Sequence, residues 1–140
     1  MTIDDERAAK QDIAEVLVRY ASGIDRRDWP LFRTVFTDDV HADYGDVGVF
    51  EGVDALTAFM EVSHVDMGHT MHKLSNLAIT VDGDRAASRT YVDAVLMAPD
   101  GQSGLNPVGF YDDELLRTPD GWRIARRRFT SVHFGVLGTS

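Results

Sequence analysis

The sequence predicts an α+β domain in which three helices pack against a curved, mostly antiparallel sheet. The first observation is the helical spacing of apolar residues, which recurs in three segments before residue 64. The second is a change to strand-like segments joined by turns, which begins at His72. Helices followed by strands are typical of a domain whose helices cover one face of a sheet. We expect one domain over residues 1–140, shaped as a cone-like barrel that encloses an apolar pocket.

The helices are predicted from apolar spacing and from residues that begin or end helices. The first spans about residues 4–22, with Thr2 as a candidate cap and Gly23 as the expected stop. A second, short helix begins at Asp28, and a third spans residues 53–63. Their predicted buried faces hold Ile13, Val16, Leu17 and Tyr20, then Leu31, Phe32, Val35 and Phe36, then Leu56, Phe59 and Met60.

The strands follow a segment, residues 40–52, that is expected to be extended and rich in turns. Asp82 and Gly83 form a strong hairpin signal between two strand-like runs. Residues 99–107 are expected to form a loop because they are rich in Gly and Pro. The result is a predicted four-stranded antiparallel meander over residues 72–81, 85–98, 108–117 and 122–135.

Composition and charge exclude several classes of function. The formal net charge is −9, and binding to nucleic acid needs a basic field, so no nucleic-acid partner is expected. The absence of cysteine excludes disulfides and a thiolate nucleophile. No apolar run approaches the roughly 20 residues that a membrane span needs. The polar N-terminal segment does not resemble a secretory signal, so we expect a cytoplasmic protein without a membrane partner.

No cofactor motif is present in the sequence. It has neither a phosphate-binding loop nor the G-x-S-x-G motif of a serine nucleophile. His64, Asp66, His69 and His72 lie near one another, but without the regular spacing of a dedicated metal site. We therefore expect neither a metal nor an organic cofactor.

Two polar residues stand in otherwise apolar surroundings. Asp25 follows the buried stripe of the first helix, and His72 opens a largely apolar strand. A carboxylate bound to one imidazole nitrogen leaves the other nitrogen available as a general base. The alternatives without a catalytic role are a helix-capping aspartate and a half-buried structural histidine. The spacing in the sequence alone does not show that the two residues are in contact. Tyr20, in the same stripe, is a core aromatic or a hydrogen-bond donor.

Three segments carry a resemblance to a known superfamily. They are "AAKQDIAEVLVRYASGIDRRDWPLFRTVFTDDV", "HTMHKLSN" and "DGWRIARRRF". Together they resemble the SnoaL-like branch of the nuclear-transport-factor-2-like superfamily, over nearly the whole chain. Within it the sequence is most similar to scytalone dehydratase, bile-acid 7-alpha-dehydratase and lindane dehydrochlorinase, which are lyases.

The resemblance implies roles for particular residues. It implies that Asp25 and His72 form a hydrogen-bonded dyad inside the cone, with His69 in a supporting position. It also implies catalytic positions for Tyr20 and for Tyr44. Tyr44 and the neighbouring Asp43 would face opposite sides of a strand, so only one of them can line the pocket.

One arginine of the C-terminal strand is also implied in catalysis. The resemblance points to Arg127, counted from Trp122, and a bulged strand would replace it by Arg126 or Arg128. Arg127 would bind an oxygen or a carboxylate of the substrate. The remaining expected substrate-binding residues are the apolar candidates Phe32, Phe36, Phe59, Met60, Met97 and Phe110.

The implied function is that of a cofactor-independent lyase. It would be a dehydratase that removes water from a small cyclic hydroxy-ketone, such as a polyketide or a steroid, with His72 as general base. A ketosteroid-isomerase-like isomerase or a polyketide cyclase, with Asp43 or His72 as base, is one alternative. A non-catalytic binding or partner subunit is another. The resemblance also implies a homo-oligomer, dimer or trimer, that packs through the outer face of the sheet.

Overall fold

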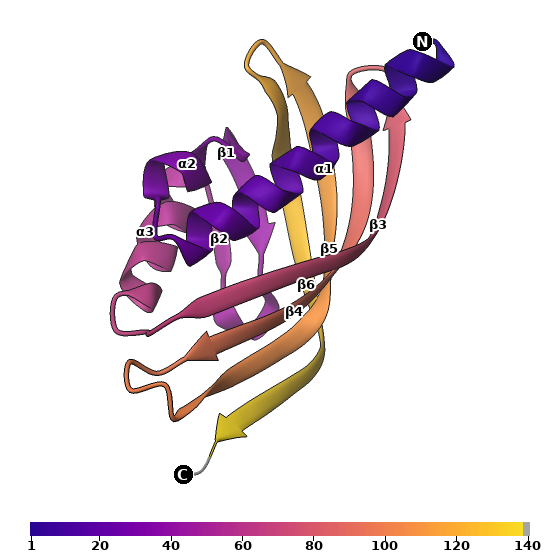
Figure 1. The fold of residues 1–140 in the computed structure, drawn as a ribbon. Helices are drawn as coiled ribbons and strands as arrows, with labels where there is room; N and C mark the ends of the chain where they lie inside the picture. The colour runs from indigo at the N-terminus through magenta and orange to yellow at the C-terminus, as the bar shows by residue number, and fades with distance from the viewer. Residues whose placement is uncertain (139–140) are drawn as a thin grey trace.

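Three helices lie across one face of a curved six-stranded sheet in the computed structural model, which describes residues 1–138 (Figure 1). The strands are ordered β2-β1-β6-β5-β4-β3. Helix α1 crosses the sheet, whereas α2 and α3 lie at one end of it, beside β1 and β2 (Figure 1). The predicted α+β class is confirmed, and the sheet is open. The elements are α1 (Ile3–Asp25), α2 (Trp29–Arg33), β1 (Phe36–Asp43), β2 (Val49–Glu51), α3 (Val53–His64), β3 (Thr70–Asp82), β4 (Arg85–Met97), β5 (Ser103–Thr118) and β6 (Gly121–Gly138).

Helix α1 is longer than the sequence pattern indicates. Thr2 caps it through a reciprocal pair of 3.0 Å hydrogen bonds with Asp5. The helix continues through Gly23, the expected stop, as far as Asp25. A Cβ atom added to Gly23 would lie 3.0 Å from the backbone of Phe32, so glycine allows α1 and α2 to approach closely. The additional residues place the Asp25 carboxylate at the end of the helix.

The predicted four-stranded meander is incomplete, because residues 36–51 add two strands. β1 pairs antiparallel with β2 and parallel with β6. It begins at Phe36, which was expected on the second helix, because α2 already ends at Arg33. A parallel partner so distant in the sequence leaves no local signal, unlike a hairpin.

The four expected strands are present, but they extend further. β3 begins at Thr70, and β5 begins at Ser103, inside the segment expected to form a loop. The register shifts between Ser75 and Ala78 of β3 and at two places between β5 and β6. Such bulges bend strands without ending them, so the long strands can curve around the helices.

Side chains fill the space between the helices and the inner face of the sheet. Tyr20, Phe32 and Phe36 are among the most buried residues, at 0–1% exposure. Their rings contact one another with centroids 5.1–6.0 Å apart. Within residues 1–138, no helix has both the length and the apolar character needed to cross a membrane.

Candidate active site

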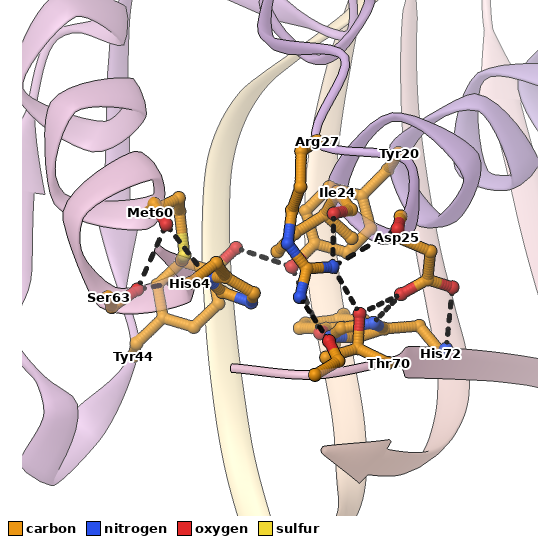
Figure 2. A network of polar contacts seen from close by, with 12 residues as sticks. Tyr20, Ile24, Asp25, Arg27, Tyr44, Met60, Ser63, His64, Thr70 and His72 are labelled. Carbon is orange, nitrogen blue, oxygen red and sulfur yellow. Dashed lines mark hydrogen bonds and ion pairs between the residues drawn. The ribbon is translucent and has the colours of Figure 1, made fainter. Parts of the chain in front are cut away.

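Asp25 of α1 and His72 of β3 are in direct contact (Figure 2). Asp25 Oδ1 lies 2.7 Å from His72 Nδ1, and Asp25 Oδ2 accepts a hydrogen bond of 2.9 Å from the His72 main-chain N–H. The His72 side chain is 8% exposed and that of Asp25 is 21% exposed. The carboxylate therefore holds both the ring and the backbone of the histidine, at the point where β3 begins.

Arg27 and Thr70 fix the position of the Asp25 carboxylate. Thr70 donates a hydrogen bond of 2.9 Å to Asp25 Oδ1. Arg27 donates to Thr70 Oγ1 and to the Gly68 carbonyl, each over 2.8 Å, and so ties the end of α1 to the start of β3 (Figure 2). Arg27 has a φ of 56°, in the left-handed region that L-residues rarely adopt. A strained residue that holds a neighbouring network is a common feature of functional sites.

The hydrogen bonds determine the charge on Asp25 and the tautomer of His72. Burial acts to raise the pKa of Asp25, but hydrogen bonds from the ring and backbone of His72 and from Thr70 outweigh it, so the pKa is lowered. An ionised carboxylate only accepts, so neutral His72 carries its proton on Nδ1. Nε2 then has a lone pair, and no hydrogen bond joins it to any residue of the described chain.

Three tyrosine hydroxyls meet deeper in the molecule. Tyr20 Oη lies 3.2 Å from Tyr44 Oη and 3.3 Å from Tyr111 Oη, and the Tyr20 ring stands edge-on to His72 with centroids 6.2 Å apart. Burial raises the pKa of all three phenols above its ordinary value, so they are neutral near pH 7. Three hydroxyl protons serve two hydroxyl–hydroxyl contacts, so one proton is left to donate elsewhere.

Of the three consecutive arginines, Arg127 points inward, whereas Arg126 and Arg128 are exposed. Its Nε and Nη2 donate to the two carboxylate oxygens of Asp113 over 2.8 and 2.9 Å. The guanidinium stacks on the rings of Tyr20 and Tyr111, 4.2 and 3.8 Å from their centroids. Because Asp113 neutralises it, Arg127 orients the tyrosines in this structure and is not poised as an anion-binding group.

A cleft of about 660 Å³ opens beside Asp25. Arg27, His64 and Met97 also line it, together with the exposed His69. The tyrosine hydroxyls do not line this cleft, because they lie in the packed interior. His72 borders a smaller groove of about 330 Å³ between α1 and β3, which also reaches Asp25.

The predicted substrate-binding residues are not all brought together. Met97 and His69 line the cleft. Phe32, Phe36 and Met60 belong to the closed core, and the Phe59 ring contacts the Phe50 ring at a tilt, with centroids 4.6 Å apart. Phe110 lies on the outer face of the sheet, where Arg89 covers its ring at 4.2 Å. The assignment of Phe110 to the pocket is wrong, because its neighbour Tyr111 takes the inward position on β5.

The residues predicted from the sequence did not include Tyr111, Asp113, Arg27 or Thr70, and His64 was considered only as a metal ligand. A signal for Asp113 existed: with Tyr111 it shares the alternate positions of β5 that face inward. The contacts of Arg27 and Thr70 depend on a turn geometry that the sequence does not reveal.

The carboxylates of Asp43, the alternative base, and of Asp93 on β4 face away from the interior. Asp43 Oδ1 accepts from the Gly45 N–H, and Oδ2 lies 4.0 Å from the exposed Arg128. Asp93 contacts Lys73 and Asn106 and is exposed. Tyr44 is therefore the inward member of the Asp43–Tyr44 pair, and an isomerase that uses Asp43 as its base loses support. In the described part of the chain, no group of three or more His, Asp or Glu side chains is arranged to hold a metal ion.

The chain is similar to proteins from several sources. It is 36% identical to the uncharacterized protein Rv2910c of Mycobacterium tuberculosis, over 87% of this chain and 84% of that protein. The crystal structure of Kfla4162 from Kribbella flavida superposes with a TM-score of 0.85 at 29% identity, over 96% of this chain and 95% of that one. A hexachlorocyclohexane dehydrochlorinase, LinA type 2, shares the fold with a TM-score of 0.79 at 20% identity, over 96% and 90% of the two chains.

The family is shown by the match over most of the sequence. The sequence model of the SnoaL-like domain matches residues 5–128, which include most of α1, the Asp25–His72 contact and the inward-facing Arg127. A cystatin-like fold is also described for a nuclear-transport-factor-2-like structure that this chain resembles with a TM-score of 0.77. The chain is therefore a member of the SnoaL-like domain family.

Proposed function

We propose that the protein is a cofactor-independent lyase, a dehydratase that removes water from a small cyclic hydroxy-ketone such as a polyketide or a steroid. The observation that carries the proposal is the 2.7 Å contact between Asp25 Oδ1 and His72 Nδ1. It leaves Nε2 of a half-buried histidine as an oriented base. The shared fold with a dehydrochlorinase, whose name denotes an elimination, supports the same class of reaction.

In the proposed reaction, His72 Nε2 takes the proton from the carbon next to the carbonyl. The electrons of that C–H bond form an enolate, and Asp25 stabilises the imidazolium. The enolate re-forms the carbonyl, a carbon–carbon double bond forms, and the bond to the hydroxyl on the next carbon breaks. The hydroxyl takes the proton from His72 and leaves as water. The product is a conjugated ketone, and the enzyme returns to its starting state.

The tyrosine cluster would stabilise the enolate. One phenolic proton of Tyr20, Tyr44 and Tyr111 is not used by their mutual contacts. Donated to the carbonyl oxygen, it would stabilise charge that develops only as the proton is removed. Arg127, stacked on Tyr20 and Tyr111, would hold these donors in position without touching the substrate. We propose Arg127 as a positioning residue.

Access to these hydroxyls requires movement. Tyr20 is 1% exposed and Tyr111 is 4% exposed, so a substrate can reach them from the cleft only when the side chains that cover them shift. Met97 at the cleft has three rotatable side-chain bonds, which suit an adaptable binding surface. The closed interior also favours a second candidate function, a non-catalytic module that binds a small molecule in the cleft alone.

Turnover of simple cyclic β-hydroxy-ketones separates the two functions. The purified protein is incubated with 3-hydroxycyclohexanone and 3-hydroxy-1-tetralone, and the conjugated product is followed by ultraviolet absorbance. We expect elimination above the background rate, a slower reaction when the carbon next to the carbonyl carries deuterium, and loss of the rate in His72→Ala. His133→Ala, which changes an exposed histidine of β6, is the control. Binding without turnover in the wild type would favour the binding module.

A further inference from the structure

We propose that His64 is a second substrate-binding histidine, whose Nε2 accepts a hydrogen bond from a hydroxyl group on the ring of the substrate. The inference deepens the proposed function and rests on it for the identity of the ligand as a hydroxylated cyclic ketone. It assigns a task to a buried histidine that the elimination itself does not use. His64 is the last residue of α3, and it lines the same cleft as Asp25.

The orientation of the His64 ring is determined by its Nδ1. This nitrogen lies 2.7 Å from the Met60 carbonyl oxygen and 3.0 Å from Ser63 Oγ (Figure 2). A carbonyl oxygen only accepts, so Nδ1 carries the proton and donates it. In the neutral ring, Nε2 is therefore a pure acceptor. The edge-on contact with Trp29, at 6.1 Å between ring centroids, holds the ring in the same orientation.

His64 Nε2 is buried and has no hydrogen-bond partner within residues 1–138. The residue is 6% exposed, so its acceptor has lost water without gaining a hydrogen bond in exchange. His64 lines the cleft, and Figure 2 shows its ring projecting from α3 toward Arg27 and Thr70. The neighbouring Arg27 directs Nη1 and Nη2 to Thr70 and to main-chain carbonyls, and not to His64.

The surroundings keep His64 neutral and select the ligand. Burial lowers the pKa of His64, the bond to the Met60 carbonyl opposes this, and Arg27 and His72 lower the pKa further, against the effect of Asp25. Asp25 and Glu61 also line the cleft and are acceptors when ionised. These acceptors favour a ligand that donates a hydrogen bond. A ring hydroxyl is the donor that a hydroxylated ketone supplies.

Binding of matched probes tests the inference without catalysis. Dissociation constants of 5-, 6- and 7-hydroxy-1-tetralone are compared with that of 1-tetralone, which lacks the hydroxyl, by calorimetric titration. In the wild type, we expect at least one hydroxy compound to bind about tenfold more tightly, as one net hydrogen bond allows. In ¹⁵N-histidine spectra, the His64 Nε2 resonance should shift with that compound and not with 1-tetralone.

Substitutions at position 64 separate the acceptor from the fold. The side-chain amide of His64→Asn reaches only as far as Nδ1 does, so it keeps a donor for Met60 and removes the acceptor at Nε2. The hydroxylated and parent tetralones should then bind this variant about equally. His64→Gln places an acceptor near Nε2 and should restore most of the preference. His133→Asn is the matched control and should keep the wild-type preference. Circular dichroism checks the fold of each variant.

Three results would overturn the inference: no binding of any tetralone by the wild type, equal binding of the hydroxylated and parent compounds, or an unchanged preference in His64→Asn. The same titrations in a His72→Ala background distinguish this failure from failure of the proposed function. Preference that persists there, with no turnover of any hydroxy-ketone by the wild type, would contradict the dehydratase and support the binding role of His64. Turnover of a hydroxy-ketone by the wild type, without tighter binding of any hydroxylated tetralone, would support the dehydratase and contradict the binding role of His64.

Discussion

The Asp25 carboxylate holds His72 at two points, the ring Nδ1 at 2.7 Å and the main-chain N–H at 2.9 Å. The first contact sets the tautomer of the base. The second ties the same carboxylate to the backbone that carries the base. Ring orientation and strand position therefore depend on one side chain, which gives Asp25 a positioning effect beyond its charge.

Replacement of Asp25 by asparagine tests that dependence. The amide can keep one hydrogen bond to His72, but it removes the charge that stabilises the imidazolium and no longer requires the proton on Nδ1. If the protein is a lyase, we expect kcat to fall about 10²- to 10⁴-fold, with little change in KM. The measurement is steady-state elimination of the best hydroxy-ketone, with the exposed Asp120→Asn as control. An unchanged kcat would contradict a catalytic Asp25–His72 pair.

Arg27 offers a test in which glycine should be better than alanine. Both Arg27→Ala and Arg27→Gly delete the hydrogen bonds to Thr70 and Gly68. Only glycine adopts the φ of 56° without strain, so Arg27→Gly should be about 1 kcal/mol more stable than Arg27→Ala. Urea denaturation of the two variants and the wild type measures the difference. Equal stability, or a more stable alanine variant, would mean that the backbone does not hold this conformation in solution.

The buried pair of Arg127 and Asp113 should show strong energetic coupling. Arg127→Met leaves the Asp113 carboxylate buried without its partner, and we expect a loss of about 3–5 kcal/mol in the free energy of unfolding. The double variant Arg127→Met/Asp113→Leu should cost less than the sum of the two single changes. The free energy of unfolding is measured by denaturant for the wild type, the two single variants and the double variant. If the losses of the two single variants add up to that of the double variant, the two groups are not energetically coupled.

The sequence predicts elements that depend on neighbouring residues better than contacts between segments that are distant in the sequence. The spacing of Ile13, Leu17 and Tyr20 predicts α1, and Asp82–Gly83 predicts the turn between β3 and β4. The contact of Asp25 with His72 was implied only by resemblance, because the two residues lie on different elements. Neither source predicts β1, whose parallel register with β6 is set by the tertiary structure.

The choice between Phe110 and Tyr111 shows a second limit. The two residues are adjacent, so one faces inward and the other outward. The buried positions of this part of β5 alternate through Gly109, Tyr111, Asp113 and Leu115, so Tyr111 and the charged Asp113 lie inside. Apolar character alone favours Phe110 for the interior. The buried ion pair with Arg127 is what makes the inward position of Asp113 acceptable, and that pairing was not visible in the sequence.

The pH dependence of stability reports on His64. Its pKa is lowered below the ordinary value of 6.5, so the unfolded chain takes up a proton there that the folded protein resists. The unfolded state then binds more protons between the two pKa values, and stability must decline as pH falls from about 6.5 toward the folded pKa.

His64→Asn removes this contribution. The stability of the wild type relative to the variant should therefore increase from pH 5 to about pH 7 and stay level above it, measured by denaturant unfolding at each pH. His133→Asn, at an exposed site, should leave the slope of the wild type unchanged. A difference between wild type and His64→Asn that does not vary with pH would mean that His64 is not held neutral beside Arg27, and that Nε2 is not kept as an acceptor at the cleft.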